Sequence, residues 1–68
     1  MFRFSRQLIL PLFLQRRMTI SDLAATAGVA YQTAARAVQG LPISAKIVDK
    51  VAAALEIDAL GYLSPTND

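Results

Sequence analysis

The chain has 68 residues, no cysteine and no histidine, and 54% of its residues are hydrophobic. A domain of this length buries only about 60% of the surface that its unfolded chain exposes. The composition excludes a disulfide framework and removes the usual zinc ligands and the usual general base. Because small domains without such staples tend to be compact helical packings or oligomers, we expect one all-α domain that has no metal and no cofactor.

The net charge of +2 is unevenly distributed along the chain. Residues 1–36 contain five arginines and one aspartate, a net charge of +4. Residues 37–68 contain two lysines and four acidic residues, a net charge of −2. A basic half suits an anionic partner such as nucleic acid.

The first residues, MFRFSRQLILPLFLQRR, resemble a signal peptide only superficially. Their apolar run, residues 8–14, is interrupted by Pro11 and is followed by Arg16 and Arg17 instead of a small-residue cleavage site. Seven residues are also too few to span a bilayer. We therefore expect a cytoplasmic protein with no membrane partner.

Residues 2–10 fit two structures. The alternation of aromatic and polar residues at the start suits an extended strand, whereas the leucines that follow also fit a helical stripe. Proline is favoured at the first position of a helix and disfavoured inside one. We therefore expect a short first helix over residues 11–17, preceded by an apolar N-terminal arm, residues 1–10. The alternative is a single kinked helix that begins at about Ser5.

The second predicted helix covers residues 20–27. Thr19 can cap it, and Asp22 follows three residues later, the spacing of a capping box. Gly28 then supplies the left-handed residue that ends this helix.

The third predicted helix begins at Ala30 or Tyr31, after a very short turn, and ends at Gly40. Its inner side is expected to carry small and apolar residues: Val29, Ala34, Ala37, Val38 and Leu41. Its outer side is expected to carry Gln32, Ala35, Arg36 and Gln39. The small inner residues would let this helix cross the second one at close range.

Two further helices are expected in the second half of the chain. Ser44 is a good N-cap for a fourth helix with the apolar stripe Ile47, Val48, Val51, Ala52 and Leu55. Asp58 can cap a last short helix through Leu63, with Leu60 and Leu63 directed inward. Residues 11–63 then form the domain, and residues 64–68 form a frayed polar tail.

Two short helices around a glycine-containing turn, with a polar outer face on the second helix, describe a helix-turn-helix. The second helix of such a unit must be slim and free of acidic groups to enter a DNA major groove, which is about 12 Å wide. Residues 29–40 contain no aspartate or glutamate.

The outer residues of the third helix have chemistry suited to bases. Gln32 can form a bidentate pair with adenine, and Arg36 can pair with the two acceptors of guanine or bind a phosphate. Tyr31 can offer its hydroxyl to a phosphate or its ring edge to a base. Residues at the N-terminal end of a recognition helix reach the bases first, which favours Tyr31 and Gln32.

Secondary contacts, with phosphates or thymine methyl groups, are expected from Thr19, Ala30, Thr33, Ala35, Gln39, Ser44 and Lys46. The same side chains also have plainer interpretations. Tyr31 would serve as a half-buried aromatic that closes the turn between the helices. Gln32, Arg36 and Gln39 would be ordinary solvated residues.

The stretch ISDLAATAGVAYQTAARAVQG resembles the helix-turn-helix of the Cro and lambda-repressor-like superfamily, the XRE type. The matching positions are Ala24, Gly28, Val29 and Gly40, and the resemblance covers about residues 11–63. Within it, AGVAYQTAARAV is also similar to the recognition segment of lac-repressor-type headpieces. The resemblance implies a compact fold of four to five helices. It also implies that Tyr31, Gln32 and Arg36 read bases and that Thr33, Ser44 and Lys46 lie near phosphates.

The sequence departs from these families in three ways. No sugar-binding domain follows, so no inducer pocket is expected. The basic–acidic pair that often links the first and third helices is replaced by Phe13 and Val38. Pro11 falls inside what the resemblance makes the first helix.

The sequence thus predicts a sequence-specific double-stranded DNA-binding transcriptional regulator, a Cro-like repressor of a phage or mobile element. Such a module usually binds two half-sites as a dimer. The candidates for a homodimer contact are Phe2, Phe4, Leu8, Leu10 and Tyr62. The alternative for the arm residues is that they complete the core of the monomer.

The alternative function is a protein-interaction module, an antitoxin or anti-repressor that binds a partner protein through the apolar arm. Enzymatic activity is not expected. The chain has no histidine or cysteine, no paired carboxylates in a plausible cleft and no phosphate-binding glycine loop.

Overall fold

The computed structural model describes residues 1–64; the expected tail, residues 64–68, lies outside this range except for its first residue. Four α-helices follow one another along the chain: α1 (Arg6–Gln15), α2 (Ile20–Ala27), α3 (Tyr31–Gln39) and α4 (Ala45–Leu55). A 3-10 turn, η1 (Ala59–Gly61), comes last. The described residues contain two isolated antiparallel bridges and no strand, which confirms the expected all-α class.

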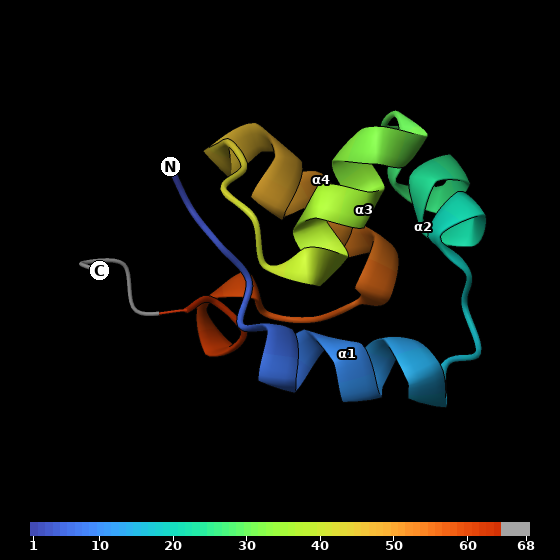
Figure 1. Ribbon diagram of the computed structural model, residues 1–68, viewed down its shortest axis with the longest axis horizontal. Helices are drawn as coiled ribbons and strands as arrows, with labels where there is room; N and C mark the ends of the chain where they lie inside the picture. Colours follow the sequence, from blue (N-terminus) through green and yellow to red (C-terminus); the bar gives the residue numbers. More distant parts are fainter. Residues whose placement is uncertain (65–68) are drawn as a thin grey trace.

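The helices α2, α3 and α4 pack on one another, and α1 crosses beside them against α3 (Figure 1). The core between them is apolar throughout, and none of the residues from 1 to 64 buries a polar or charged side chain. Its largest fully buried side chains come from the residues before α1 and from α1, α2 and α4: Phe4, Ile9, Leu23, Val51 and Leu55. Phe13 and Val38, the apolar substitutes for an ion pair, are both buried in this core.

The first helix begins at Arg6, with Ser5 as its N-cap, and continues through Pro11 to Gln15. The expectation of a helix over residues 11–17 is therefore wrong, and the alternative of one helix starting near Ser5 is confirmed. Pro11 is exposed and removes only one helical hydrogen bond, at a cost of about 3 kcal/mol. Burial of Ile9 and Phe13, one turn apart on the inner side of α1, offsets this cost.

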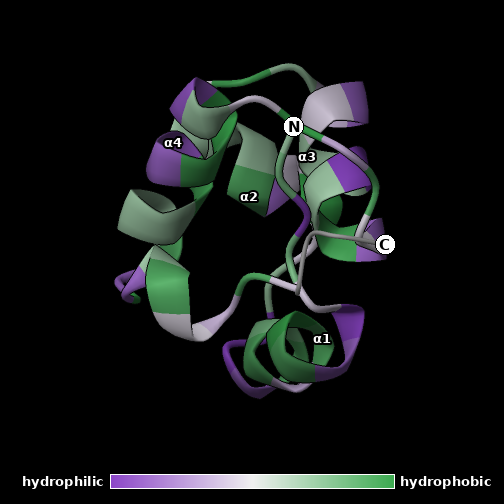
Figure 2. Ribbon diagram, turned by 90° about the vertical axis from the view of Figure 1, so that its left-hand side faces the viewer, coloured by the Kyte–Doolittle hydropathy of each residue, from purple (hydrophilic) through white to green (hydrophobic). Residues whose placement is uncertain are grey.

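Not all of the apolar surface of α1 is buried. Figure 2 looks almost along α1, at the bottom of the view, and shows its coils largely in green, the colour of hydrophobic residues. Leu8 is 50% exposed and Leu14 is 66% exposed. The described part of the chain has no helix that is both long enough and apolar enough to cross a membrane.

The residues before α1 form an extended segment, residues 2–5, that runs between two other parts of the chain. Phe2 pairs with Ile43 of the α3–α4 loop, and Phe4 pairs with Leu63 near the C-terminal end. The side chain of Phe4 is only 1% exposed. The segment therefore completes the core of its own chain, as the alternative for the arm residues proposed.

The second half of the chain largely follows the sequence pattern. Ser44 caps α4, and the four residues Val48, Val51, Ala52 and Leu55 are buried. Asp58 caps η1, but this turn has only three residues, so the expected last helix through Leu63 is wrong. The chain becomes extended at Leu63 because that residue pairs with Phe4. Leu60, expected inside, is 82% exposed.

Candidate nucleic-acid interface

Local hydrogen bonds and one glycine set the start of α2 and the turn from α2 into α3. Thr19 and Asp22 form the predicted capping box: the Thr19 hydroxyl accepts the Asp22 N–H at 3.1 Å, and the Asp22 carboxylate accepts the Thr19 N–H at 3.0 Å. Gly28 ends α2 in the left-handed conformation, with φ of 71°. Its N–H and that of Val29 both donate to the Ala24 carbonyl, which aims the chain directly into α3.

Small side chains lie where α2 crosses α3. Ala24 of α2 and Ala34 and Ala37 of α3 are buried, as is Val38. Because alanine adds little bulk, the two helices pack closely and the turn between them stays short. Of the residues expected on the inner side of α3, Leu41 is the exception, since it is exposed.

The outer face of α3 carries the predicted base-reading residues. Tyr31, Gln32, Arg36 and Gln39 are all exposed, and they occupy one side of a nine-residue helix. Tyr31 is 57% exposed, so its side chain is accessible to an external ligand. The structure therefore brings together on one accessible face the three side chains Tyr31, Gln32 and Arg36.

Arg36 makes a contact that the sequence pattern did not predict. Its Nη2 donates a hydrogen bond of 3.0 Å to the carbonyl oxygen of Pro42, in the loop between α3 and α4. A guanidinium has five N–H donors, so this bond leaves others for an external ligand. No local sequence signal marks this contact, because the Pro42 carbonyl lies in the loop beyond the Gly40 cap.

The predicted secondary contacts occupy several elements. Ala30, Gln39, Ser44 and Lys46 are exposed, and Thr33 and Ala35 are half-buried. The hydroxyls of Thr19 and Ser44 each accept a backbone N–H at a helix start, from Asp22 and Ile47 respectively. Each of these hydroxyls keeps its own proton available for donation to an acceptor such as a phosphate oxygen.

The sequence on both sides of α3 contains no acidic residue over a long stretch. Residues 23–48 contain Arg36 and Lys46 but no aspartate or glutamate. The nearest acidic residue before them, Asp22, has a pKa below its usual range because it accepts the backbone N–H of Thr19 and, second, interacts with the Thr19 side chain. That carboxylate is therefore ionised at neutral pH, and it is tied to the start of α2.

The dimer candidates are distributed between the core and the surface. Phe4 is fully buried, Leu10 and Tyr62 are half-buried, and Phe2 and Leu8 are exposed. Only the last two present an accessible apolar surface in the single chain.

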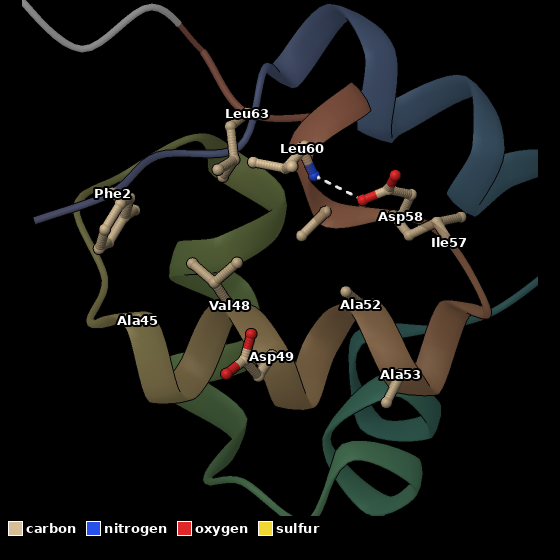
Figure 3. A pocket seen from close by; sticks show the side chains of 11 residues that line it. Phe2, Ala45, Val48, Asp49, Ala52, Ala53, Ile57, Asp58, Leu60 and Leu63 are labelled. Carbon is tan, nitrogen blue, oxygen red and sulfur yellow. Dashed lines mark hydrogen bonds between the residues drawn. The ribbon is translucent and has the colours of Figure 1, made fainter.

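A separate groove lies between α4, η1 and the extended segment (Figure 3). It has a volume of about 530 Å³, and no residue of α2 or α3 lines it. Its walls are mainly apolar side chains, among them Phe2, Val48 and Leu63, with the carboxylates of Asp49 and Asp58 at its edge. Within residues 1–64 no group of acidic side chains is arranged to hold a metal ion.

A comparison of the chain with protein-family models, with characterised proteins and with solved structures finds no match.

Proposed function

We propose that the protein is a sequence-specific double-stranded DNA-binding transcriptional regulator, a Cro-like repressor with a lambda-repressor-like helix-turn-helix. In this proposal α2 and α3 are the two helices of the motif, and α3 enters the major groove. The protein acts as a homodimer on two half-sites, because a single short recognition helix reads too few base pairs to define one site.

One observation carries the proposal: α3 presents a slim, acid-free outer face with Tyr31, Gln32 and Arg36 exposed together. An α-helix with such a face fits the width of the major groove, and an acidic group there would repel the phosphates. The small buried residues between α2 and α3 let the two helices pack closely, so the opposite side of α3 faces solvent.

The residue roles follow from position along α3. Tyr31 and Gln32 lie in its first turn, which reaches the base edges first in this docking mode. Arg36 lies one turn later, where its free donors reach a guanine or a phosphate. Ser44 and Lys46 at the start of α4 then contact the neighbouring backbone phosphates.

Selection of bound sequences from a random duplex library tests the proposal directly. We expect a palindromic site whose half-site spacing reports the dimer. On that site, Gln32→Ala and Arg36→Ala should each weaken binding by about 1–3 kcal/mol and relax the preference at one base pair.

Matched controls separate recognition from general charge and stability. Gln15→Ala and Arg6→Ala remove an exposed glutamine and an exposed arginine side chain from α1, which lies outside the proposed interface. These variants should keep the selected sequence preference. If Gln32→Ala and Arg36→Ala bind the selected site as the unmodified protein does, the roles assigned to α3 are wrong.

The exposed apolar surface of α1, at Leu8 and Leu14, favours a second candidate function, a protein-interaction module such as an antitoxin or anti-repressor. A salt series on random duplexes distinguishes the two candidates. DNA binding should weaken steeply with salt because phosphate contacts release counterions. A module that acts only on a partner protein would bind no duplex at any salt concentration.

A further inference from the structure

The extended segment, residues 2–5, leads from the N-terminus into α1 (Figure 1). Backbone hydrogen bonds hold it on both of its edges. On one edge the N–H of Phe2 donates to the Ile43 carbonyl, and the N–H of Ile43 donates to the Phe2 carbonyl, each at 2.8 Å. On the other edge the N–H of Ser5 donates to the Tyr62 carbonyl at 2.7 Å. The segment therefore has a fixed position relative to the α3–α4 loop.

A single peptide unit connects this segment with Arg36. The carbonyl of Pro42 and the N–H of Ile43 belong to the same planar group, which is trans, so they point in opposite directions. The carbonyl accepts the hydrogen bond from Arg36, and the N–H donates to Phe2. Because the unit is rigid, its orientation on the Phe2 side fixes the carbonyl on the Arg36 side.

The other contacts of the α3–α4 loop restrict the conformations that the Pro42–Ile43 peptide can adopt. The N–H of Leu41 donates to the Arg36 carbonyl at 3.0 Å, which ties the start of the loop to α3. The Ile43 side chain is buried, and Gly40 lies directly against the Phe4 carbonyl. Loss of the Phe2 hydrogen bonds would leave the rotation of the Pro42–Ile43 peptide as the main remaining freedom of the loop.

We propose that the extended segment is a positioning element for Arg36, acting through the Pro42–Ile43 peptide. Ordering the guanidinium before binding lowers the side-chain entropy that is lost when it engages a ligand. The consequence for DNA rests on the proposed function, whereas the ordering of Arg36 is a property of the free protein. The segment would thus influence base recognition without touching DNA.

Two variants isolate the backbone contribution. Deletion of Phe2 and Arg3 places Met1 next to Phe4 and removes both hydrogen bonds to Ile43, while the buried Phe4 is kept. The double substitution Phe2→Ala with Arg3→Ala removes the same two side chains but keeps the backbone. Circular dichroism identifies the temperature at which both variants are folded. If the deletion variant does not fold, a chain that begins at Arg3 replaces it, since that chain also lacks both hydrogen bonds to Ile43.

The first measurement needs no DNA. ¹⁵N relaxation of the Arg36 Nε–H group reports how well the guanidinium is ordered. We expect the unmodified protein and the double-alanine variant to show an ordered group, and the deletion variant to approach the mobility of Arg6, an exposed arginine on α1. Equal order in all three proteins would overturn the proposal.

The second measurement is a double-mutant cycle on the selected duplex. We expect the deletion to weaken binding about fivefold relative to the double-alanine variant, or ~1 kcal/mol, and by less than about twofold when Arg36→Ala is already present. An equal loss in both backgrounds would show that the segment does not act through Arg36. If the unmodified protein prefers no sequence at all, the proposed function fails, and the relaxation data still decide the positioning role.

Discussion

Gly28 and Gly40 end α2 and α3 with nearly the same left-handed backbone but in different surroundings. Their φ angles are 71° and 76°. A Cβ on Gly28 would meet no atom within 4 Å, whereas a Cβ on Gly40 would lie 3.2 Å from the Phe4 carbonyl oxygen. The first position therefore needs glycine for its dihedral angles alone, and the second needs it also for the close approach of the extended segment.

This difference predicts unequal costs for two alanine substitutions. We expect Gly28→Ala to lower the free energy of unfolding by about 1 kcal/mol. This is the left-handed penalty of alanine, partly offset because alanine reduces the conformational entropy of the unfolded chain. Gly40→Ala should cost more, because the Phe4 backbone must also shift. Chemical denaturation of the two variants measures both values. Equal costs would contradict the close packing of the extended segment against Gly40.

The Asp22 carboxylate predicts a pH dependence of stability. Its pKa is lowered in the folded chain, first by the backbone N–H of Thr19, so below neutral pH the unfolded state binds more protons than the folded state. The stabilisation is therefore complete above the ordinary aspartate pKa and is lost as the pH falls through the lowered folded value. We expect the stability difference between the unmodified protein and Asp22→Asn to shrink over this acidic range. Thermal unfolding at a series of pH values tests this, and a pH-independent difference would contradict it.

At the scale of the element, α1 is the helix whose local sequence opposes its structure. Pro11 sits in its sixth position, where proline removes a backbone hydrogen bond and crowds the preceding turn. The helix persists because Ile9 and Phe13 are buried on its inner side. Tertiary packing thus overrides a strong local signal.

Replacement of this proline should stabilise the protein. Pro11 is exposed, so Pro11→Ala loses no core contact and restores a helical N–H. We expect the free energy of unfolding to rise by about 1–3 kcal/mol, the helix penalty of proline less its effect on the unfolded chain. Urea denaturation measures the change, and Gln7→Ala, an exposed position in the same helix, is the control. A destabilised Pro11→Ala would mean that the proline fits a local distortion of α1.

The helices α2 and α3 show the opposite relation between sequence and structure. The bounds of α2 and α3 agree with the predicted ones, since three of the four ends are fixed by a local signal: the capping box at Thr19, Gly28 and Gly40. The start of α3, at Ala30, has no side-chain cap. The exposure of the outer residues of α3 follows equally from helical periodicity. The path of the Arg36 side chain does not follow from periodicity, because its hydrogen-bond acceptor, the Pro42 carbonyl, belongs to the next loop.

At the scale of the whole molecule, the proposed homodimer needs a contact surface between two copies of the chain. The predicted contact residues differ sharply in exposure: Leu8 is half exposed, whereas Phe4 belongs to the core. We expect Leu8→Glu to reduce dimer formation while leaving the unfolding temperature nearly unchanged. Phe4→Ala should instead destabilise the fold by about 3–5 kcal/mol, since it leaves a large cavity.

Sedimentation and thermal unfolding of both variants separate the two roles. Gln7→Glu places the same charge beside Leu8 on α1 and serves as the control for charge alone. If Leu8→Glu remains fully dimeric, the dimer contact does not involve Leu8. The groove between α4 and η1, with Leu60 exposed at its edge, is then the next surface to test.

The sequence by itself determined the positions of α2, α3 and α4, the caps at Thr19, Gly28, Gly40 and Ser44, and the outer face of α3. It could do so because capping, glycine conformation and helical periodicity act between residues a few positions apart. Only the tertiary structure decided the continuation of α1 through Pro11, the exposure of Leu60 and the link from the extended segment to Arg36. Each of these depends on contacts between residues far apart in the chain, such as Phe2 with Ile43 and Phe4 with Leu63. Such contacts form only when the core closes, and their burial is strong enough to outweigh the local preferences that a sequence pattern records.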